Sequence, residues 1–157
     1  MPGSALPRIE IFPHTDCTGL SIEHLVEQVI QSLPWCITSC GHEPALLGGL
    51  DEVEISLVTD EVIARVHGEF MNDPTPTDVI TFHHGEILVS VDTARREAAF
   101  HGNSLAEETL LYIIHGLLHL NGHIDVKEPD RSTMHREQEA ILKRIIGGPT
   151  EVRRSNQ

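Results

Sequence analysis

Apolar residues recur along the first part of the chain with two different periods, and these periods predict the order of its elements. A period of two over 8–12 and again over 53–58 is typical of strands, and Pro13 favours a sheet edge for the first of them. Between these segments, 21–33 has apolar residues at the 3.6-residue spacing of a helix. We expect Pro34 to end that helix, because proline supplies no backbone N–H.

The middle of the chain continues with further helix and strand patterns, separated by an extended loop at Pro74 and Pro76. Each pattern is short and is bounded by residues that favour caps or turns. The expected elements are a helix over 61–70 capped by Thr59 and Asp60, strands over 77–82 and 86–91 joined by a hairpin turn at 83–85, and a helix capped by Asp92 and Thr93 that ends near His101.

The most apolar segment, 105–120, predicts a helix enclosed by protein on most sides, since its apolar residues occupy more than one helical stripe. Ser104 and Glu107 have capping-box spacing, which sets where this helix begins. A last helix follows Pro129 and stops at 147–149, where the sequence is Gly-Gly-Pro. The elements together predict an α+β fold, in which a small mixed sheet of about four strands packs with about five helices around the central one.

Length and charge narrow the classes of protein that the chain can belong to. Its 157 residues fit one domain, which we expect over 1–149, followed by a flexible tail over 150–157. The 24 acidic and 11 basic residues give a net charge of −13, which argues against a protein that coats nucleic acid through a broad basic face. Any RNA partner must therefore be held locally.

The cysteines and the apolar runs indicate where the protein works. Cys17, Cys36 and Cys40 are an odd number without a CxxC pair, which suits reduced thiols better than a disulfide framework. No run reaches the ~18 apolar residues of a membrane span, and the N-terminal segment lacks the pattern of a secretory leader. We therefore expect a cytoplasmic protein with no membrane partner. The sequence does not predict its oligomeric state.

The end of the central helix carries the strongest chemical pattern in the sequence. His115 and His119 are four residues apart, so they project from one face of a helix and can reach the same metal ion. Gly122 is placed to end the helix in the left-handed conformation, which turns the chain back toward the histidines. Either His123 or Asp125 can then supply a third ligand. Three protein ligands are the number that a catalytic zinc site uses when water takes the fourth position.

The donor types indicate which metal and which chemistry to expect. Neutral imidazoles with one carboxylate suit a single zinc ion best, although manganese and iron accept similar donors. Gly116 follows the first histidine, where zinc peptidases of the HExxH type have the glutamate that acts as general base. We therefore assign catalysis to a metal-bound water and assign no protein base, because zinc alone lowers the pKa of bound water to about 7.

Three blocks of this sequence resemble one known family. The segment 115–122, His-Gly-Leu-Leu-His-Leu-Asn-Gly, looks like the HGxLHLxGxDH signature of the YbeY family of endoribonucleases and ribosomal RNA maturation factors. The segment 76–82, Pro-Thr-Asp-Val-Ile-Thr-Phe, resembles that family's PTDVLSF strand, and 85–87 resembles its GDI strand start. The similarity covers roughly residues 50–145, in the same order and with similar spacing. The first fifty residues fit only by their pattern of elements.

The resemblance implies a compact α+β domain with one zinc ion, and ribosomal RNA and the small ribosomal subunit as partners. The implied activity is hydrolysis of single-stranded RNA at the 3′ end of small-subunit ribosomal RNA and in ribosome quality control. Asp125 stands where the family has its third histidine, which favours Asp125 over His123 as the third ligand and adds one negative charge to the site. Met71 stands where the family has a site arginine, so that loop supplies no guanidinium to clamp a phosphate.

Other residues are candidates for the cleft around the metal. Arg65, Arg95 and Arg96 are candidates to replace the missing arginine, although we favour their interpretation as solvated surface arginines. His67 is a candidate for lining the cleft, and Asp78 for orienting a metal histidine. Two other functions remain open: a ribosome-assembly factor with a structural, four-ligand metal site, and a metal-dependent peptidase.

Overall fold

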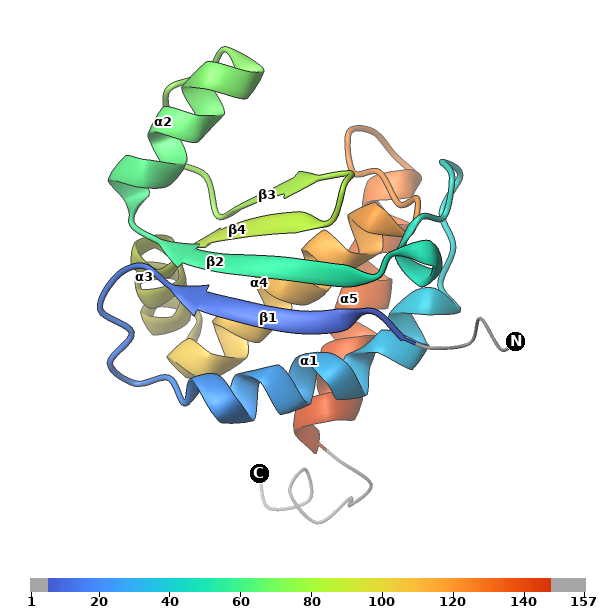
Figure 1. The fold of residues 1–157 in the computed structure, drawn as a ribbon, viewed down its shortest axis with the longest axis horizontal. Coiled ribbons are helices and arrows are strands. Elements are labelled where there is room, and N and C mark those ends of the chain that lie inside the picture. Colours follow the sequence, from blue (N-terminus) through green and yellow to red (C-terminus); the bar gives the residue numbers. More distant parts are fainter. Residues whose placement is uncertain (1–5, 148–157) are drawn as a thin grey trace.

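Four strands form one mixed sheet in the computed structural model, which describes residues 6–147. Their order in the sheet is β1, β2, β4, β3, with β1, β2 and β4 parallel and β3 antiparallel to β4 (Figure 1). The antiparallel pair is the predicted hairpin, and β1 is an edge strand as expected. Their bounds are β1 Arg8–Pro13, β2 Glu52–Val58, β3 Val79–Phe82 and β4 Glu86–Ser90.

The helices cover the two faces of this sheet unequally. Figure 1 shows α1, α3, α4 and α5 gathered on one side, with α2 projecting from the sheet on its own. Alternate residues of β4 enter two separate cores: Ile87 and Val89 join the large core under α1 and α4, whereas Leu88 joins a small core with Ile63 of α2. The helices are α1 Ile22–Ile37, α2 Asp60–Met71, α3 Val91–His101, α4 Leu105–Leu120 and α5 Asp130–Gly147, with a 3-10 helix over Leu47–Gly49. The predicted α+β class, with about four strands and five helices, is confirmed.

The central helix α4 begins at the predicted capping box. The hydroxyl of Ser104 accepts a hydrogen bond from the backbone N–H of Glu107 at 3.0 Å, and the carboxylate of Glu107 accepts one from the backbone N–H of Ser104 at 3.1 Å. Helices α1, α3 and α5 pack around α4, together with strands β3 and β4. That enclosure explains why the apolar residues of α4 occupy more than one stripe, and it fixes the helix that carries the histidine pair.

Two sequence predictions about helix ends are wrong. Helix α1 continues one turn past Pro34 to Ile37. Proline has no N–H to donate to the carbonyl of Ile30, four residues earlier, so α1 continues with one backbone hydrogen bond fewer. The buried side chains of Leu33 and Cys36 continue the packing of the helix on both sides of the proline.

The cap of α3 is Ser90 rather than Asp92. The hydroxyl of Ser90 accepts from the backbone N–H of Thr93 at 3.1 Å, so the helix starts at Val91, which the sequence placed in β4. Asp92 instead accepts from the backbone N–H of Asp60 at 2.8 Å, which satisfies the first turn of α2. Asp92, which the sequence predicts as the cap of α3, thus makes a contact with the distant helix α2 instead.

The predicted tail, 150–157, and the end of the predicted domain at 149 lie outside the described residues. Within residues 6–147, no helix is long and apolar enough to cross a membrane.

Candidate metal centre

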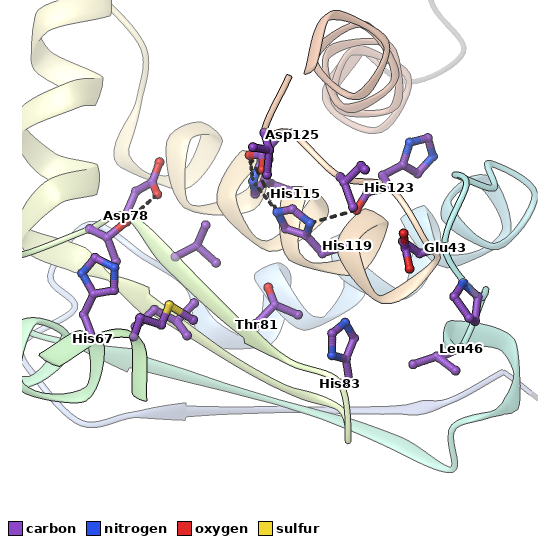
Figure 2. A pocket seen from close by; sticks show the side chains of 17 residues that line it. Glu43, Leu46, His67, Asp78, Thr81, His83, His115, His119, His123 and Asp125 are labelled. Atoms are coloured by element: carbon purple, nitrogen blue, oxygen red, sulfur yellow. Dashed lines mark hydrogen bonds and ion pairs between the residues drawn. The ribbon is translucent and has the colours of Figure 1, made fainter. Parts of the chain in front are cut away.

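The two histidines of α4 face a cleft that is bounded by several segments of the chain. One wall is formed by the loop after α1, and another by the end of α2 and the strand β3. The loop after α4 closes the side that carries the histidines (Figure 2). The cleft therefore brings the motif of α4 together with residues from the first half of the chain.

Three donor atoms converge at this cleft. The Nε2 atoms of His115 and His119 are 3.0 Å apart, and Oδ2 of Asp125 lies 3.3 Å from the first and 3.8 Å from the second. All three side chains are partly buried, with Asp125 the most exposed at 40%. Each offers one ligand atom within 4.8 Å of the other two, which is the spacing expected of ligands that share one ion.

The second nitrogen of each ring is held by an acceptor. Nδ1 of His119 lies 3.0 Å from the backbone carbonyl oxygen of His123, and a carbonyl can only accept, so this Nδ1 carries a proton. Nδ1 of His115 donates to Oε1 of Gln138 in α5 at 2.6 Å. Protonation at Nδ1 leaves both Nε2 atoms as lone pairs directed at the cleft when the rings are neutral.

This donor set fits a cation. Two imidazole lone pairs and a carboxylate oxygen at 3.0–3.8 Å repel one another unless positive charge lies among them. Without a metal, a proton can take that place: burial alone would lower the pKa of His115, but hydrogen bonds to Asp125 and Gln138 and the charge of Asp125 outweigh burial and raise it. A divalent cation would supply more charge to all three donors at once.

The pKa values of His119 and Asp125 are also shifted by the neighbouring groups of the site. Burial and the neighbouring His115 lower the pKa of His119. The hydrogen bond with His115 lowers the pKa of Asp125, against a smaller opposing effect of burial. A carboxylate that stays charged next to a neutral imidazole is the form in which both groups bind metal.

Gly122 ends α4 in the predicted left-handed conformation, with a φ of 97°. The N–H of Gly122 donates to the carbonyl of His119 and that of His123 to the carbonyl of Leu118, which is the Schellman pattern. A Cβ at Gly122 would also lie 2.2 Å from the carbonyl oxygen of Glu43. Glycine is therefore needed here for both conformation and space, and the turn that it permits brings Asp125 back to the histidines.

The loop after α1 forms backbone hydrogen bonds with the end of α4. The backbone N–H groups of Gly41, Glu43 and Leu46 donate to the carbonyls of Asn121, Gly122 and Leu120. The buried amide of Asn121 donates in turn to three carbonyl oxygens, of Cys36, Ile37 and Ser39, each at 3.0 Å. The end of α1 and the ligand-bearing turn are thus one connected unit.

The ring of His123 does not join the other three groups. Its Nε2 lies 3.0 Å from the backbone carbonyl oxygen of Ser39 and 2.9 Å from the hydroxyl of Ser39. That hydroxyl donates to the carboxylate of Glu137 at 2.7 Å, so it accepts from His123. Nε2 of His123 is therefore a donor that is already used, whereas its backbone carbonyl contributes to the site by orienting His119.

Gly116 faces the sheet instead of the cleft. A Cβ at this position would lie 2.9 Å from the side chain of Ile87 and 3.1 Å from the hydroxyl of Thr81. The close approach of α4 to β3 and β4 thus favours glycine, because a larger residue here would require the side chains of Ile87 and Thr81 to shift. This geometry gives a packing reason for the departure from the peptidase motif.

The remaining predicted residues have different positions. Asp78, His67 and Met71 all line the cleft. The carboxylate of Asp78 accepts from the hydroxyl of Thr77 at 3.4 Å, and Nδ1 of His67 lies 2.8 Å from the carbonyl oxygen of Thr75. Arg65, Arg95 and Arg96 are not among the described residues that line the cleft.

Sequence reasoning missed Gln138, Ser39 and Glu43. Gln138 and Ser39 hold histidines of the motif region, and Glu43 lines the cleft. No local pattern points to them, because each is more than twenty residues from its partner and its own surroundings look like an ordinary helix or loop. The helical spacing of Gln138 with the core residues Met134 and Ile141 is the one available signal, since it directs Gln138 toward α4.

Comparison with known proteins finds relatives that align with more than half of this chain. The family described as Endoribonuclease YbeY matches residues 15–146 of the chain. The Endoribonuclease YbeY of Heliobacterium modesticaldum is 37% identical over 117 residues, which cover 60% of this chain and 70% of that protein. That of Thermus thermophilus is 38% identical over 102 residues, covering 57% and 73%, and that of Protochlamydia amoebophila is 42% identical over 91 residues, covering 51% and 61%.

One solved structure shows the same fold. A solution structure of a protein from Thermotoga maritima superposes with a TM-score of 0.58 at 24% identity, and the match covers 94% of this chain and 93% of that one. The family match starts at residue 15, so the similarity extends beyond the sequence motifs into α1.

Proposed function

The chain belongs to the Endoribonuclease YbeY family, and from this we propose that it is a metal-dependent endoribonuclease that hydrolyses single-stranded RNA. The observation that carries the proposal is the convergence of two imidazole nitrogens and one carboxylate oxygen at the cleft. The finer parts of the proposal rest on the family resemblance. They are a single zinc ion, the 3′ end of small-subunit ribosomal RNA as substrate, a role in ribosome quality control, and work on the small subunit in the cytoplasm.

We assign His115, His119 and Asp125 as the metal ligands, through Nε2, Nε2 and a carboxylate oxygen. When bound, a divalent metal supplies Lewis acidity, which acidifies water and polarises a phosphoryl oxygen. Gln138 and the carbonyl of His123 keep the two imidazoles in the tautomer that directs Nε2 at the ion. The carboxylate of Asp125 adds a negative charge to the ligand set, which lowers the Lewis acidity compared with three neutral histidines.

The open side of the site supports catalysis over a structural role. Structural zinc sites usually have four protein ligands. His123 is the candidate for a fourth ligand, but Nε2 of its ring is hydrogen-bonded to Ser39. Three ligands beside a cleft leave room for water and a phosphodiester. We assign no side chain as general base.

Metal analysis followed by RNA cleavage tests the proposal. We expect about one zinc per chain in the purified protein, cleavage of single-stranded RNA that stops with chelator, and recovery when zinc is added back. His115→Ala and His119→Ala should each reduce cleavage by at least two orders of magnitude. His24→Ala, which removes an exposed histidine of α1, is the matched control.

Other results would refute the proposed function or favour one of the two alternatives, an assembly factor or a peptidase. Cleavage that persists undiminished in both histidine variants would refute the proposed function. Tight metal binding without cleavage of any single-stranded RNA would favour an assembly factor with a structural metal. Zinc-dependent digestion of casein would favour a peptidase.

A further inference from the structure

The cleft beside the metal ligands is acidic and lacks strong cations. Among the described residues that line it there is no lysine or arginine, and its carboxylates are those of Glu43, Asp78 and Asp125. Proteins usually hold the phosphates of nucleic acids with lysine, arginine or backbone N–H groups. In a chain of net charge −13, this cleft offers phosphates little attraction away from the metal itself.

The candidate replacement arginines do not change this, and neither does Lys127, which follows Val126 in the sequence. A guanidinium nitrogen of Arg96 lies 2.7 Å from the carboxylate of Asp60, and Arg95 donates to the backbone carbonyl of Asp16 at 3.2 Å. Arg65 and Lys127 are exposed, but neither lines the cleft. The cleft must therefore hold a substrate by other means.

Exposed apolar side chains surround the cleft instead. Leu46 from the loop after α1 is 37% exposed, Met71 at the end of α2 is 49% exposed, and Val126 just after Asp125 is 76% exposed. They come from three different segments that line the cleft, so a ligand lying in it can cover all three. Covering exposed apolar surface is favourable because it removes that surface from water.

Two imidazole rings add flat surfaces to the same cleft. His67 and His83 both line it, and Figure 2 shows them along the β3 side, away from the metal ligands. Histidine rings stack on unpaired bases in RNA-binding proteins. The cleft thus combines apolar contacts and stacking surfaces, and both suit the face of a nucleobase better than a phosphate.

Resting on the proposed function, we infer that this cleft binds unpaired RNA through its bases, with phosphate contact confined to the metal. Bases within a duplex are stacked and cannot reach Leu46, Met71 or the imidazole rings. Selection of single-stranded RNA then follows from access to the bases. Binding should also depend only weakly on salt, because few counterions are released.

The salt dependence of binding measures how many phosphates the protein neutralises. We would titrate the zinc-loaded protein into a labelled, hydrolysis-resistant phosphorothioate RNA tetranucleotide at several KCl concentrations, at about pH 8, where an ordinary imidazole is neutral. Each neutralised phosphate of a single strand contributes about 0.7 to the slope of log K against log salt. We expect a slope of about 0.7 or less in magnitude for the natural chain.

Two arginine variants separate the cleft from the rest of the surface. Met71→Arg places a guanidinium in the cleft and should steepen the slope by about 0.7. Phe100→Arg places one on the exposed end of α3, at a residue that does not line the cleft, and should leave the slope unchanged.

An RNA that lacks bases tests the contact directly. A tetranucleotide with abasic riboses keeps its phosphates, so we expect it to bind at least about fivefold more weakly than the complete RNA. Equal binding of the two RNAs, or a slope of about 1.4 or more for the natural chain, would overturn the inference. Zinc-dependent RNA cleavage accompanied by either result would leave the proposed function intact. Absence of both cleavage and binding would refute the proposed function and this inference together.

Discussion

Oε1 of Gln138 lies 2.6 Å from Nδ1 of His115, so a residue of α5 sets the tautomer of a candidate metal ligand on α4. An amide oxygen at this place only accepts, which keeps the proton on Nδ1 and the lone pair on Nε2. The contact also ties the packing of the last helix to the chemistry of the cleft.

Gln138→Leu should weaken metal binding by about 10- to 100-fold, the range observed when partners of metal-bound histidines are removed. Gln138→Glu keeps an acceptor at the same position and should bind metal at least as tightly as the natural chain. Competition titration with a chromophoric chelator measures both affinities. Gln31→Leu, on the exposed face of α1, is the control, and equal affinities for Gln138→Leu and Gln31→Leu would contradict the assigned role.

The third ligand can be identified by comparing Asp125→Ala with His123→Ala. Loss of the Asp125 carboxylate removes a donor and should lower zinc affinity by more than 100-fold. Loss of the His123 ring breaks its bonds to Ser39 but leaves the backbone carbonyl on His119, so we expect a decrease of about tenfold or less. Isothermal titration calorimetry with zinc distinguishes them. The reverse order of affinities would show that His123 rearranges to bind the metal.

Asp60 should make the protein sensitive to acid. Partial burial alone would raise the pKa of Asp60, but hydrogen bonds from Ser90, Thr93 and Arg96 outweigh burial and lower it. A lowered folded-state pKa contributes stability above the unfolded value of about 3.9, and this stability is lost as pH falls through the lower folded value. We expect Asp60→Asn to cost about 1–2 kcal/mol at pH 7.

Urea denaturation at several pH values checks this prediction. The difference between Asp60→Asn and the natural chain should begin to shrink as pH falls below about 3.9, the unfolded pKa, and should be smallest below the lowered folded pKa of Asp60, where the natural carboxylate is protonated. Asp51→Asn, which changes an exposed carboxylate, should show little difference at either pH. A cost for Asp60→Asn that stays constant down to pH 2 would contradict an electrostatic cause.

Replacing Asn121 with a charged residue of the same shape should destabilise the protein more than replacing it with a smaller residue. Asn121→Ala leaves three carbonyl oxygens at the end of α1 without their shared donor, at a cost of about 1–3 kcal/mol. Asn121→Asp keeps the shape but directs a carboxylate at those oxygens, so its thermal midpoint at pH 7 should be lower still. Gln31→Ala, which removes an exposed amide of α1, serves as the control. An aspartate variant that is as stable as the natural chain would show that water can replace these bonds.

Patterns among residues that are close in the sequence were sufficient to predict part of the fold and part of the site. The capping box at Ser104, the left-handed Gly122 and the shared face of His115 and His119 all depend on neighbours within four residues, and the structure has each of them. These features form wherever the segment is helical, because their hydrogen bonds and spacing are internal to it. The hairpin of β3 and β4 was predictable for the same reason.

The rest depends on contacts between distant segments. Pro34 is tolerated inside α1 because the residues around it pack on the core, and Asp92 is drawn from its own helix to the first turn of α2. Gln138 became recognisable as a partner of His115 only once α5 was placed beside α4. The parallel order of β1, β2 and β4 could not be predicted from the periodicity of apolar residues. The same holds for these contacts between distant residues.

The order along the chain of the segments that form the cleft separates two properties that an enzyme must combine. The three proposed ligands lie in one continuous stretch of eleven residues, 115–125, whereas the walls formed by the loop after α1, the end of α2 and β3 come from segments before residue 85. Substitutions in the walls can therefore change which molecule is recognised without changing the ion that is bound. Natural variation and protein engineering thus have independent access to specificity and to reactivity in this molecule.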